Sequence, residues 1–327
     1  MMTKRTMVRL ALAGLLAATG CAATMPAGAQ AFPSRPVRLV VTFPAGSGPD
    51  TIARSIAPKM SEALGQQVVV DNRPGAGGNV AALAVLNERR DGHTLLMGTD
   101  SLYSLNPFLF PKAGYDASTD FVLVTPLAEA ALFLVSNASL KLGSAKDLVA
   151  LVKSEPGKLN YSAPTGTPHH LAGERFTALN GLDWTRVSYR DAQQAITEVA
   201  AGLVPAAFST WPSIAPYVSS GRLSLLGITT PTRFDTLPNV PALAETWPGF
   251  EETGWFAILA PKGTPQAAID LLNAAALKAR EASELRPRLE AQGMRLINAD
   301  AKAFEARIRR ETQARSELIR TRGIKVD

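Results

Sequence analysis

Apolar residues along this chain alternate between short β-branched runs and longer stretches with a helical period. The clearest example begins with the run LVVTF at residues 39–43, which stops at Pro44; a loop of small residues separates it from the stretch Thr51–Leu64. On one helical face of that stretch lie four apolar residues: Ile52, Ile56, Met60 and Leu64. The pattern predicts a strand, a tight glycine turn and a helix that is capped by Asp50 or the residue before it.

The same alternation continues through the rest of the chain. Further strands are expected at residues 67–70, 94–97, 157–162, 186–189, 205–208, 223–229 and 255–259. Further helices are expected at residues 80–88, 144–153, 171–179, 191–201, 266–281 and 301–320, whereas residues 106–121 look irregular. Alternating strands and helices are typical of an α/β fold with parallel strands.

Two apolar stretches around Pro126, within residues 121–135, indicate a first crossing into a second lobe, and the strand at 255–259 indicates the return. We therefore predict an α/β protein with two lobes, a mostly parallel sheet in each, and a hinge of crossing strands. The expected division assigns residues 32–130 and 254–327 to lobe 1 and residues 131–253 to lobe 2. Loops from both lobes would meet in the cleft between them.

The first thirty-one residues are predicted to be a cleaved signal peptide. Three basic residues precede a short apolar run at residues 10–16, and Ala29-Gln30-Ala31 provides the exit site, so cleavage is expected after Ala31. The mature protein would then reside outside the cytoplasm. The stretch Ala18–Cys21 also resembles a bacterial lipobox, which leaves lipid attachment at Cys21 as an alternative.

Removing this leader changes the charge and the cysteine content. It leaves 31 basic and 28 acidic residues, a net charge of +3 that is spread along the chain. No basic stripe with interleaved aromatic residues is present, which argues against nucleic acid as a partner. Cys21 is the single cysteine, so the mature chain would have neither a disulfide nor thiol chemistry.

The sequence offers little for catalysis or for metal binding. It contains no G-x-S-x-G, H-E-x-x-H or G-x-x-x-x-G-K-[ST] motif. Neighbouring residues such as His169 and His170 do not face one site on a helix, so neither a metal nor a cofactor is expected. One of the two should hydrogen-bond backbone while the other lines the cleft, and His93 is expected at the surface. The protein is therefore not expected to be an enzyme.

Donor-rich loops are the stronger signal. Hydroxyl groups stand at several loop tips: Ser47, Ser101, Thr165, Thr167, Ser209 and Thr210. Glycine amides and helix N-termini add further donors, and such converging dipoles can hold a small carboxylate without a formal counter-charge. For any single loop, an ordinary strand–helix turn remains an alternative.

Several segments together resemble the Bug family, the periplasmic solute-binding proteins of the tripartite tricarboxylate transporter type. The segments are FPAGSGPDTIAR, VVVDNRPGAGGN, DGHTLLMG, HHLAGERF, VSYRDAQQAITEVAAG, RLSLLGIT, LPNVPALAE and GWFAILAPKGTP. The resemblance covers residues 32–327 and implies a two-lobed, type II-like periplasmic binding protein that closes by hinge motion. It also implies delivery of a small organic carboxylate to membrane permease subunits. We expect the protein to be a monomer. Presentation of the loaded protein to a sensor kinase, or a secreted hydrolase on a similar scaffold, are the alternatives.

The resemblance also implies a set of ligand-binding positions. In lobe 1 these are Ala45, Gly46, Ser47, Gly48, Asp50, Gly77, Gly78, Asn79 and Ser101. In lobe 2 they are Thr165, Gly166, Thr167, His169, Ser209, Thr210 and Trp211. Asp50 would brace the loop rather than touch an anion, Gly77 and Gly78 could merely permit a close turn, and Trp211 could belong to the core.

Two positions depart from the family pattern. Asp191 stands where a small residue is common, and it would either cap the following helix or face the cleft and favour a ligand with an amino or hydroxyl group. Pro164 would stiffen the loop that follows it.

Overall fold

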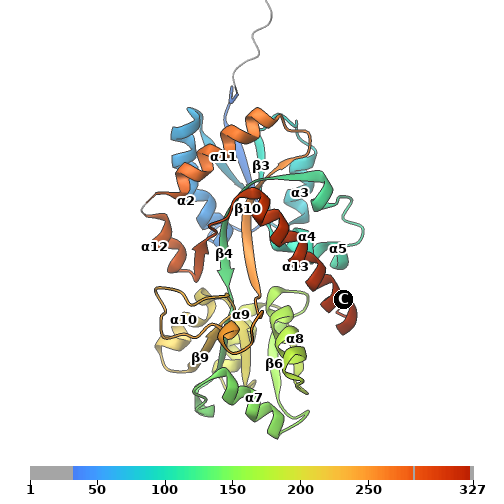
Figure 1. Ribbon diagram of the computed structural model, residues 1–327, viewed down its shortest axis with the longest axis vertical. Helices are drawn as coiled ribbons and strands as arrows, with labels where there is room; N and C mark the ends of the chain where they lie inside the picture. The colour runs from blue at the N-terminus through green and yellow to red at the C-terminus, as the bar shows by residue number, and fades with distance from the viewer. Residues whose placement is uncertain (1–31, 283, 325–327) are drawn as a thin grey trace, which may run out of the picture.

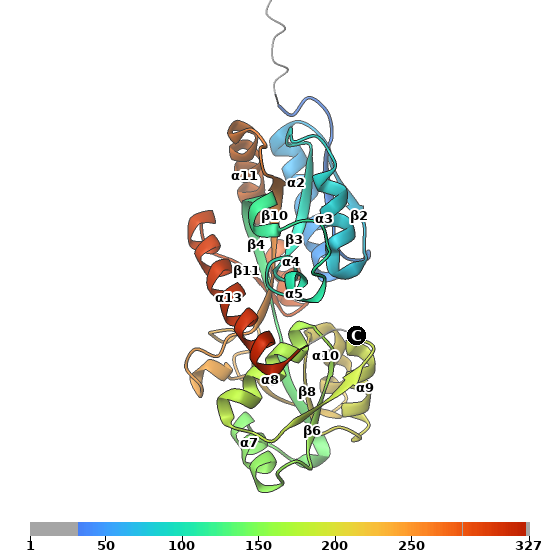
Figure 2. The same cartoon turned by 90° about the vertical axis from the view of Figure 1, so that its right-hand side faces the viewer.

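The computed structural model describes residues 32–282 and 284–324. The predicted signal peptide and Cys21 lie outside the described residues. The chain forms two lobes stacked along the long axis of the molecule, each with a sheet covered by helices (Figures 1 and 2). The predicted two-lobed α/β fold is confirmed.

Lobe 1 is built on a six-stranded sheet. In spatial order its strands are β11 (Met294–Leu296), β4 (Phe121–Ala131), β10 (Thr253–Pro261), β3 (Thr94–Thr99), β1 (Val37–Val41) and β2 (Val68–Asn72). Its helices are α2 (Gly48–Leu64), η1 (Ala76–Gly78), α3 (Asn79–Leu86), α4 (Asp100–Ser104), α5 (Asn106–Leu109), α6 (Ala117–Asp120), α11 (Gln266–Arg280), α12 (Leu285–Glu290) and α13 (Ala301–Arg322). Neighbouring residues of β1, Leu39 and Val40, are both fully buried but belong to separate apolar clusters. The sheet is therefore covered on both faces, which explains why its strands read as continuous apolar runs.

Lobe 2 is built on a five-stranded sheet. In spatial order its strands are β7 (Thr185–Tyr189), β6 (Asn160–Pro164), β8 (Ala206–Ser209), β5 (Phe133–Asn137) and β9 (Leu223–Ile228). Its helices are η2 (Ala138–Leu140), α7 (Ala145–Ser154), α8 (Pro168–Asn180), α9 (Ala192–Ala200), α10 (Trp211–Ser219) and η3 (Leu243–Glu245). Leu134 and Val135 of β5 again pack into separate clusters, one on each face of the sheet.

Both sheets are mixed. The strands that alternate with helices are parallel, with β1 between β2 and β3 in lobe 1 and β6 between β7 and β8 in lobe 2. Antiparallel pairs are added by the crossing strands β4 and β10, by β11, and by β5 with its neighbours. The alternation of strands and helices in the sequence predicted the parallel strand pairs. The antiparallel pairs arise because the chain crosses between the lobes twice.

The strand ends of the two lobes face one another across the hinge. Strand β4 leaves lobe 1 and β10 returns to it, and Ala131 pairs with Thr253 where they cross. The carboxyl end of β3, at Thr99, pairs with Phe256 near the start of β10. The carboxyl end of β8, at Ser209, pairs with Phe133 at the start of β5. The parallel strands of each lobe run in the same direction as β3 or β8, so their carboxyl ends also point toward the other lobe. The loops that follow these strands therefore converge on the space between the lobes.

Several element boundaries differ from expectation. Helix α2 starts at Gly48 with Ser47 as its N-cap, so the prediction that Asp50 or Pro49 caps it is wrong. Ser47 is extended at φ −71° and ψ 165°, and Pro49 suits the first turn of a helix because it needs no amide donor there. Helix α8 likewise starts at Pro168, which places His169 in its first turn. The stretch expected to be irregular, residues 106–121, contains the short helices α5 and α6.

Helix α13 ties the two lobes together. Its Arg315 is buried and pairs with Asp100 of α4 and with Glu252, the residue before β10, each at 2.6 Å. Near its end, Arg322 pairs at 2.5 Å with Glu174 of α8 in lobe 2. A small apolar cluster also joins residues of both lobes: Leu105, Leu171, Ile319 and Ile324. Figure 1 shows α13 running from lobe 1 down to α8.

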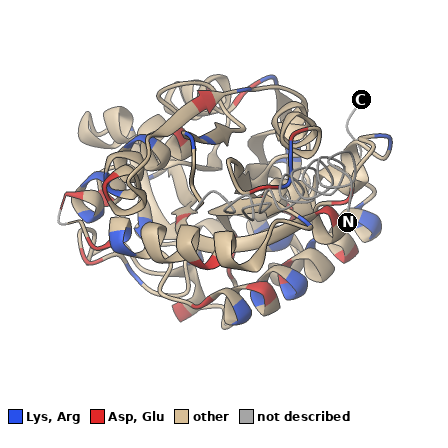
Figure 3. Ribbon diagram, turned by 90° about the horizontal axis from the view of Figure 1, so that it is seen from above, with Lys and Arg blue, Asp and Glu red and all other residues tan. Residues whose placement is uncertain are grey.

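Charged residues of both signs are interspersed over the ribbon (Figure 3). Within residues 32–282 and 284–324, no helix combines the length and the apolar character needed to cross a membrane.

Candidate functional site

The loop between β1 and α2 is organised around Asp50. The Gly46 amide donates to Asp50 Oδ2 at 2.8 Å, and Asn72 Nδ2 donates to Asp50 Oδ1 at 2.9 Å. Arg54 Nε donates to both carboxylate oxygens at 3.0 Å, and its Nη2 reaches Asn72 Oδ1 at 2.9 Å. Although burial alone would raise the pKa of Asp50, the bonds from Gly46, Arg54 and Asn72 lower it. Asp50 is thus an ionised brace that links the loop, α2 and the end of β2.

These internal bonds decide which donors of the loop remain free. The Gly46 amide is used by Asp50, and the Ser47 hydroxyl donates to the Pro44 carbonyl at 2.6 Å. Helix α2 has no side-chain cap, and amides of a first helical turn have no acceptor within the helix. The amides of Gly48 and Asp50 and the positive end of the helix dipole are therefore the part of the loop suited to an anion. Ala45 is exposed beside them.

The glycine loop before α3 is a close turn. Gly77 and Gly78 have φ of 64° and 97°, a region that L side chains rarely adopt. A Cβ on Gly78 would lie 3.1 Å from Thr42 Cβ, so the turn requires glycine at this position. The buried Asn79 faces inward, and its Oδ1 accepts from Asn106 Nδ2 at 2.8 Å and from the Tyr115 hydroxyl at 2.7 Å. Its side-chain carbonyl is thereby committed to lobe 1.

Helix α4 follows β3 directly and carries Ser101 in its first turn. Ser101 is half-buried, and the helix lacks a side-chain cap at Thr99. The Thr99 hydroxyl is itself buried without a hydrogen-bond partner among the described residues. Thr99 was not among the predicted ligand-binding positions, although it lies in the loop expected after the strand at residues 94–97.

In lobe 2 the loop from β6 to α8 is stiffened by its own side chains. Thr165 Oγ1 lies 2.7 Å from Ser188 Oγ and accepts from Arg186 Nη1 at 3.0 Å. The Thr167 hydroxyl donates to the Pro164 carbonyl at 2.8 Å and caps α8 by accepting from the His170 amide. These two hydroxyl groups, expected to be free donors, are therefore largely engaged within the loop.

The two adjacent histidines have different surroundings. His170 Nδ1 accepts from the Gly166 amide at 3.2 Å, which confirms that one of them binds backbone. Both ring nitrogens of His169 are buried without a hydrogen-bond partner among the described residues. Burial lowers the pKa of His169 to about 4, so its imidazole is neutral near pH 7 and offers one donor and one acceptor. His93, expected at the surface, is instead buried, and its Nε2 accepts from the Ser34 amide.

The end of β8 supplies a further unpartnered group, the hydroxyl of Ser209. Ser209 is 1% exposed, and its hydroxyl has no hydrogen-bond partner among the described residues. Helix α10 begins two residues later without a side-chain bond from its N-cap Thr210. Trp211 is half-buried, with its ring 5.2 Å from that of Phe133. Trp211 therefore packs against the core of lobe 2 at the edge that faces lobe 1.

Asp191 caps α9, as one of the two interpretations predicted. It is exposed, and its Oδ1 accepts from the Gln194 amide at 2.8 Å.

A segment that the sequence analysis did not anticipate lies against the loops of both lobes. A Cβ on Gly293 would come within 2.6 Å of Trp211 Cβ, and a Cβ on Gly48 would lie 3.3 Å from Met294 Sδ. Gln292 Nε2 also donates to Thr51 Oγ1 at 3.4 Å. Residues 292–294 therefore separate α2 from α10 on one side of the hinge. In the sequence, Gly293 is a signal that could have indicated a turn at this segment, because glycine often ends a helix.

The unpartnered His169 predicts a measurable loss of stability in mild acid. With a pKa of about 4 when folded and 6.5 when unfolded, His169 binds a proton more readily in the unfolded chain. Its contribution to stability is complete above pH 6.5 and is lost as pH falls toward 4. Between about pH 7 and about pH 5, wild type should lose about 1–2 kcal/mol more unfolding free energy than His169→Phe. Urea denaturation at both pH values measures this difference, and equal losses would show that His169 is not desolvated.

Comparison with known proteins agrees with this architecture. Residues 52–324 match the family model described as the tripartite tricarboxylate transporter family receptor. The chain is 33% identical to Protein BugT of Bordetella pertussis, over 97% of this chain and 98% of that protein. It is also 35% identical to a UPF0065 protein from the tcbD-tcbE intergenic region of Pseudomonas sp. strain P51, over 95% of this chain and 93% of that protein.

Solved structures give the same picture. One from R. palustris, determined with adipate, is 30% identical with a TM-score of 0.76, covering 90% of this chain and 100% of that one. MatC from Rhodopseudomonas palustris, determined with bound malate, is 28% identical with a TM-score of 0.71, covering 88% of this chain and 100% of that one. The protein belongs to the tripartite tricarboxylate transporter receptor family, as its motifs predicted.

Proposed function

We propose that this protein captures a small organic carboxylate between its two lobes and delivers it to the permease of a tripartite tricarboxylate-type transporter. The observation that carries the proposal is the meeting of strand ends from both lobes, where α2 and α10 begin without side-chain caps. The adipate and malate of the two related structures are carboxylates of the proposed class. The protein would act in the periplasm as a monomer and without catalysis.

In this proposal the amides of Gly48 and Asp50 hold the near carboxylate, while His169 and Ser209 approach from lobe 2. Ala45 and Ser101 border the ligand, and Gly46, Gly78 and Thr165 keep the loops in shape.

The lobes divide at residues 130/131 and 253/254, supported by the pairing of Ala131 with Thr253. Bending of β4 and β10 at that point would close the cleft.

A thermal-shift series tests the proposal. Adipate, malate, other mono- and dicarboxylates and acidic amino acids are compared with their amides at equal concentrations. At least one carboxylate should raise the melting temperature progressively with concentration, because a ligand that binds only the folded state stabilises it. No stabilisation by any carboxylate would overturn the proposal. The proposal would also be overturned if the protein chemically consumed a stabilising ligand and substitution of a loop hydroxyl residue abolished that consumption. Such a result would indicate an enzyme.

Ser209→Ala should weaken binding without destabilising the protein. A hydrogen bond to a charged group is worth about 1.5–3 kcal/mol, so calorimetry should show roughly 10- to 150-fold weaker binding. The Ser209 hydroxyl has no protein partner within the described residues, so the unfolding free energy should not fall. Ser136→Ala is the matched control, because Ser136 is equally buried and unpartnered but pairs with Ala206, at the far end of β8. Equal affinity losses in both variants would remove Ser209 from the site.

A further inference from the structure

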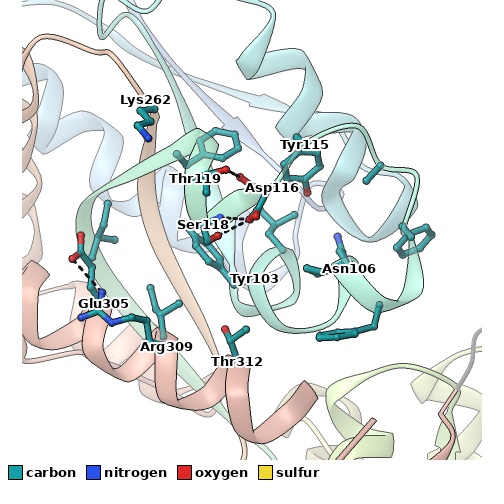
Figure 4. A pocket seen from close by; sticks show the side chains of 18 of the residues that line it. Tyr103, Asn106, Tyr115, Asp116, Ser118, Thr119, Lys262, Glu305, Arg309 and Thr312 are labelled. Carbon is teal, nitrogen blue, oxygen red and sulfur yellow. Dashed lines mark hydrogen bonds and ion pairs between the residues drawn. The ribbon is translucent and has the colours of Figure 1, made fainter. Parts of the chain in front are cut away.

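A cavity lies on the flank of lobe 1, apart from the space between the lobes. It has a volume of about 820 Å³ and lies between α13 and the segment from α4 to the start of β4 (Figure 4). All of its lining residues fall within 102–123, 262 and 305–313, so lobe 2 contributes none. The shape of this cavity therefore does not depend on whether the lobes are open or closed.

The walls of the cavity are mainly apolar and aromatic. Tyr103, Phe110, Tyr115 and Phe121 line it, and Phe108, a large apolar side chain with 44% exposure, borders it. The volume lies within the range of roughly 300–1,000 Å³ that is usual for small-molecule sites. Such walls suit a flat apolar body rather than water alone.

Most polar groups of the cavity are already committed to the protein. Asp116 caps α6 by accepting from the amide and the hydroxyl of Ser118 at 2.8 and 2.6 Å. Asn106 and the Tyr115 hydroxyl both donate to Asn79. These groups are therefore poorly placed to bind a further molecule.

Tyr103 and Lys262 provide uncommitted donors in the cavity. Within the described residues, neither the Tyr103 hydroxyl nor the Lys262 ammonium has a hydrogen-bond or ion-pair partner, and both lie along the cavity in Figure 4. Burial raises the pKa of Tyr103, so its phenol stays protonated. Arg309 is exposed and lies 3.9 Å from its nearest carboxylate, that of Glu305. These groups offer a neutral donor in an apolar wall and two loosely held cations at the rim, where the carboxylate of Glu305 lies beside Arg309.

We propose that this cavity is a second ligand site, which takes a small aromatic anion with its ring against the aromatic wall that includes Tyr103 and its charge toward Lys262 and Arg309. The site lies outside the proposed carboxylate cleft and does not require it. The apolar ring of the ligand packs against the aromatic walls, and its anionic group forms an ion pair with the ammonium of Lys262.

The probe 1-anilinonaphthalene-8-sulfonate, an aromatic anion that fluoresces in apolar surroundings, tests the proposal. Titrations compare wild type with Lys262→Gln, which removes the charge, and with Thr312→Trp, which fills the cavity. Lys302→Gln is the control, an exposed lysine of α13 outside the lining. Circular dichroism and melting temperature verify that each variant is folded.

We expect Lys262→Gln to bind the probe at least about fivefold more weakly, Thr312→Trp to lose binding, and Lys302→Gln to match wild type. Saturating adipate or malate should not displace the probe. Failure of wild type to bind, wild-type affinity in the folded Lys262→Gln variant, or displacement by a dicarboxylate would each overturn the second site. None of these outcomes depends on whether the cleft binds a carboxylate.

Discussion

Replacing Arg315 with methionine is expected to lower the free energy of unfolding by about 3–5 kcal/mol, because two buried carboxylates would lose their shared counter-charge. Asp100 and Glu252 both lie 2.6 Å from the guanidinium, and their side chains are 5% and 1% exposed. Burial alone would lower the pKa of Arg315, but these two neighbours raise it, so it is charged at any physiological pH. Urea denaturation near pH 7 measures the loss.

The matched control for this substitution is Arg310→Met, which removes an exposed arginine from the same helix and should change stability by less than about 0.5 kcal/mol. Burial already raises the pKa of Glu252. Without Arg315 that carboxylate should take up a proton more readily, so the deficit of the variant should shrink as the pH is lowered. Equal effects of the two substitutions would mean that the buried network does not stabilise the fold.

The second large effect is expected at the β1–α2 loop. Ala45→Asp should weaken carboxylate binding at least about tenfold, or about 1.4 kcal/mol, because it places a negative charge beside the helix end proposed to hold the ligand. Ala45→Asn has nearly the same shape without the charge and should stay within about twofold of wild type. Calorimetry with the dicarboxylate that gives the largest thermal shift measures both variants.

Raised salt should reduce the difference in carboxylate affinity between Ala45→Asp and Ala45→Asn, because screening weakens repulsion between exposed charges. If Asp and Asn at position 45 weaken binding equally, the effect is steric. If neither weakens it, the loop is not the anchor of the carboxylate.

Much of the fold could be predicted from apolar patterning. Strand β1 and helix α2 were readable because a buried strand gives a continuous apolar run and a helix gives a period of 3.6 residues. Strand β11 has three residues, and its partner β4 lies more than 160 residues earlier in the chain. No local pattern reports such a pairing, so residues 292–294 and their contacts were missed.

The candidate site was predicted less completely. Residue types identified the donor-rich loops, but not which donors the protein itself consumes. Thr165 and Thr167 look equivalent to Ser209 in the sequence, yet the first two are bonded within their loop and Ser209 is not. This distinction depends on side-chain geometry across elements, which composition and spacing do not contain.

Helix α13 illustrates the same limit at larger scale. Its mixed charges read as a solvated amphipathic helix, and nothing local singles out Arg315 among its arginines. The burial of Arg315 follows from the packing of α13 against α4 and the start of β10. Arg315 links α4 to Glu252 beside the crossing strand β10, and this link could be recognised only in three dimensions.

The most direct test of ligand capture between the lobes is a distance measured across the hinge. Spin labels on cysteines placed at Val80 of lobe 1 and Leu203 of lobe 2 suit this purpose, since both side chains are exposed, at 47% and 70%. Val80 lies in α3 and Leu203 follows α9, and these two helices lie on the same side of the molecule (Figure 2). Cys21, the single native cysteine, is replaced by serine. Pulsed electron resonance should show a shorter distance with the stabilising dicarboxylate and no change with its diamide. An unchanged distance, under conditions where calorimetry shows the dicarboxylate bound, would contradict capture between the lobes.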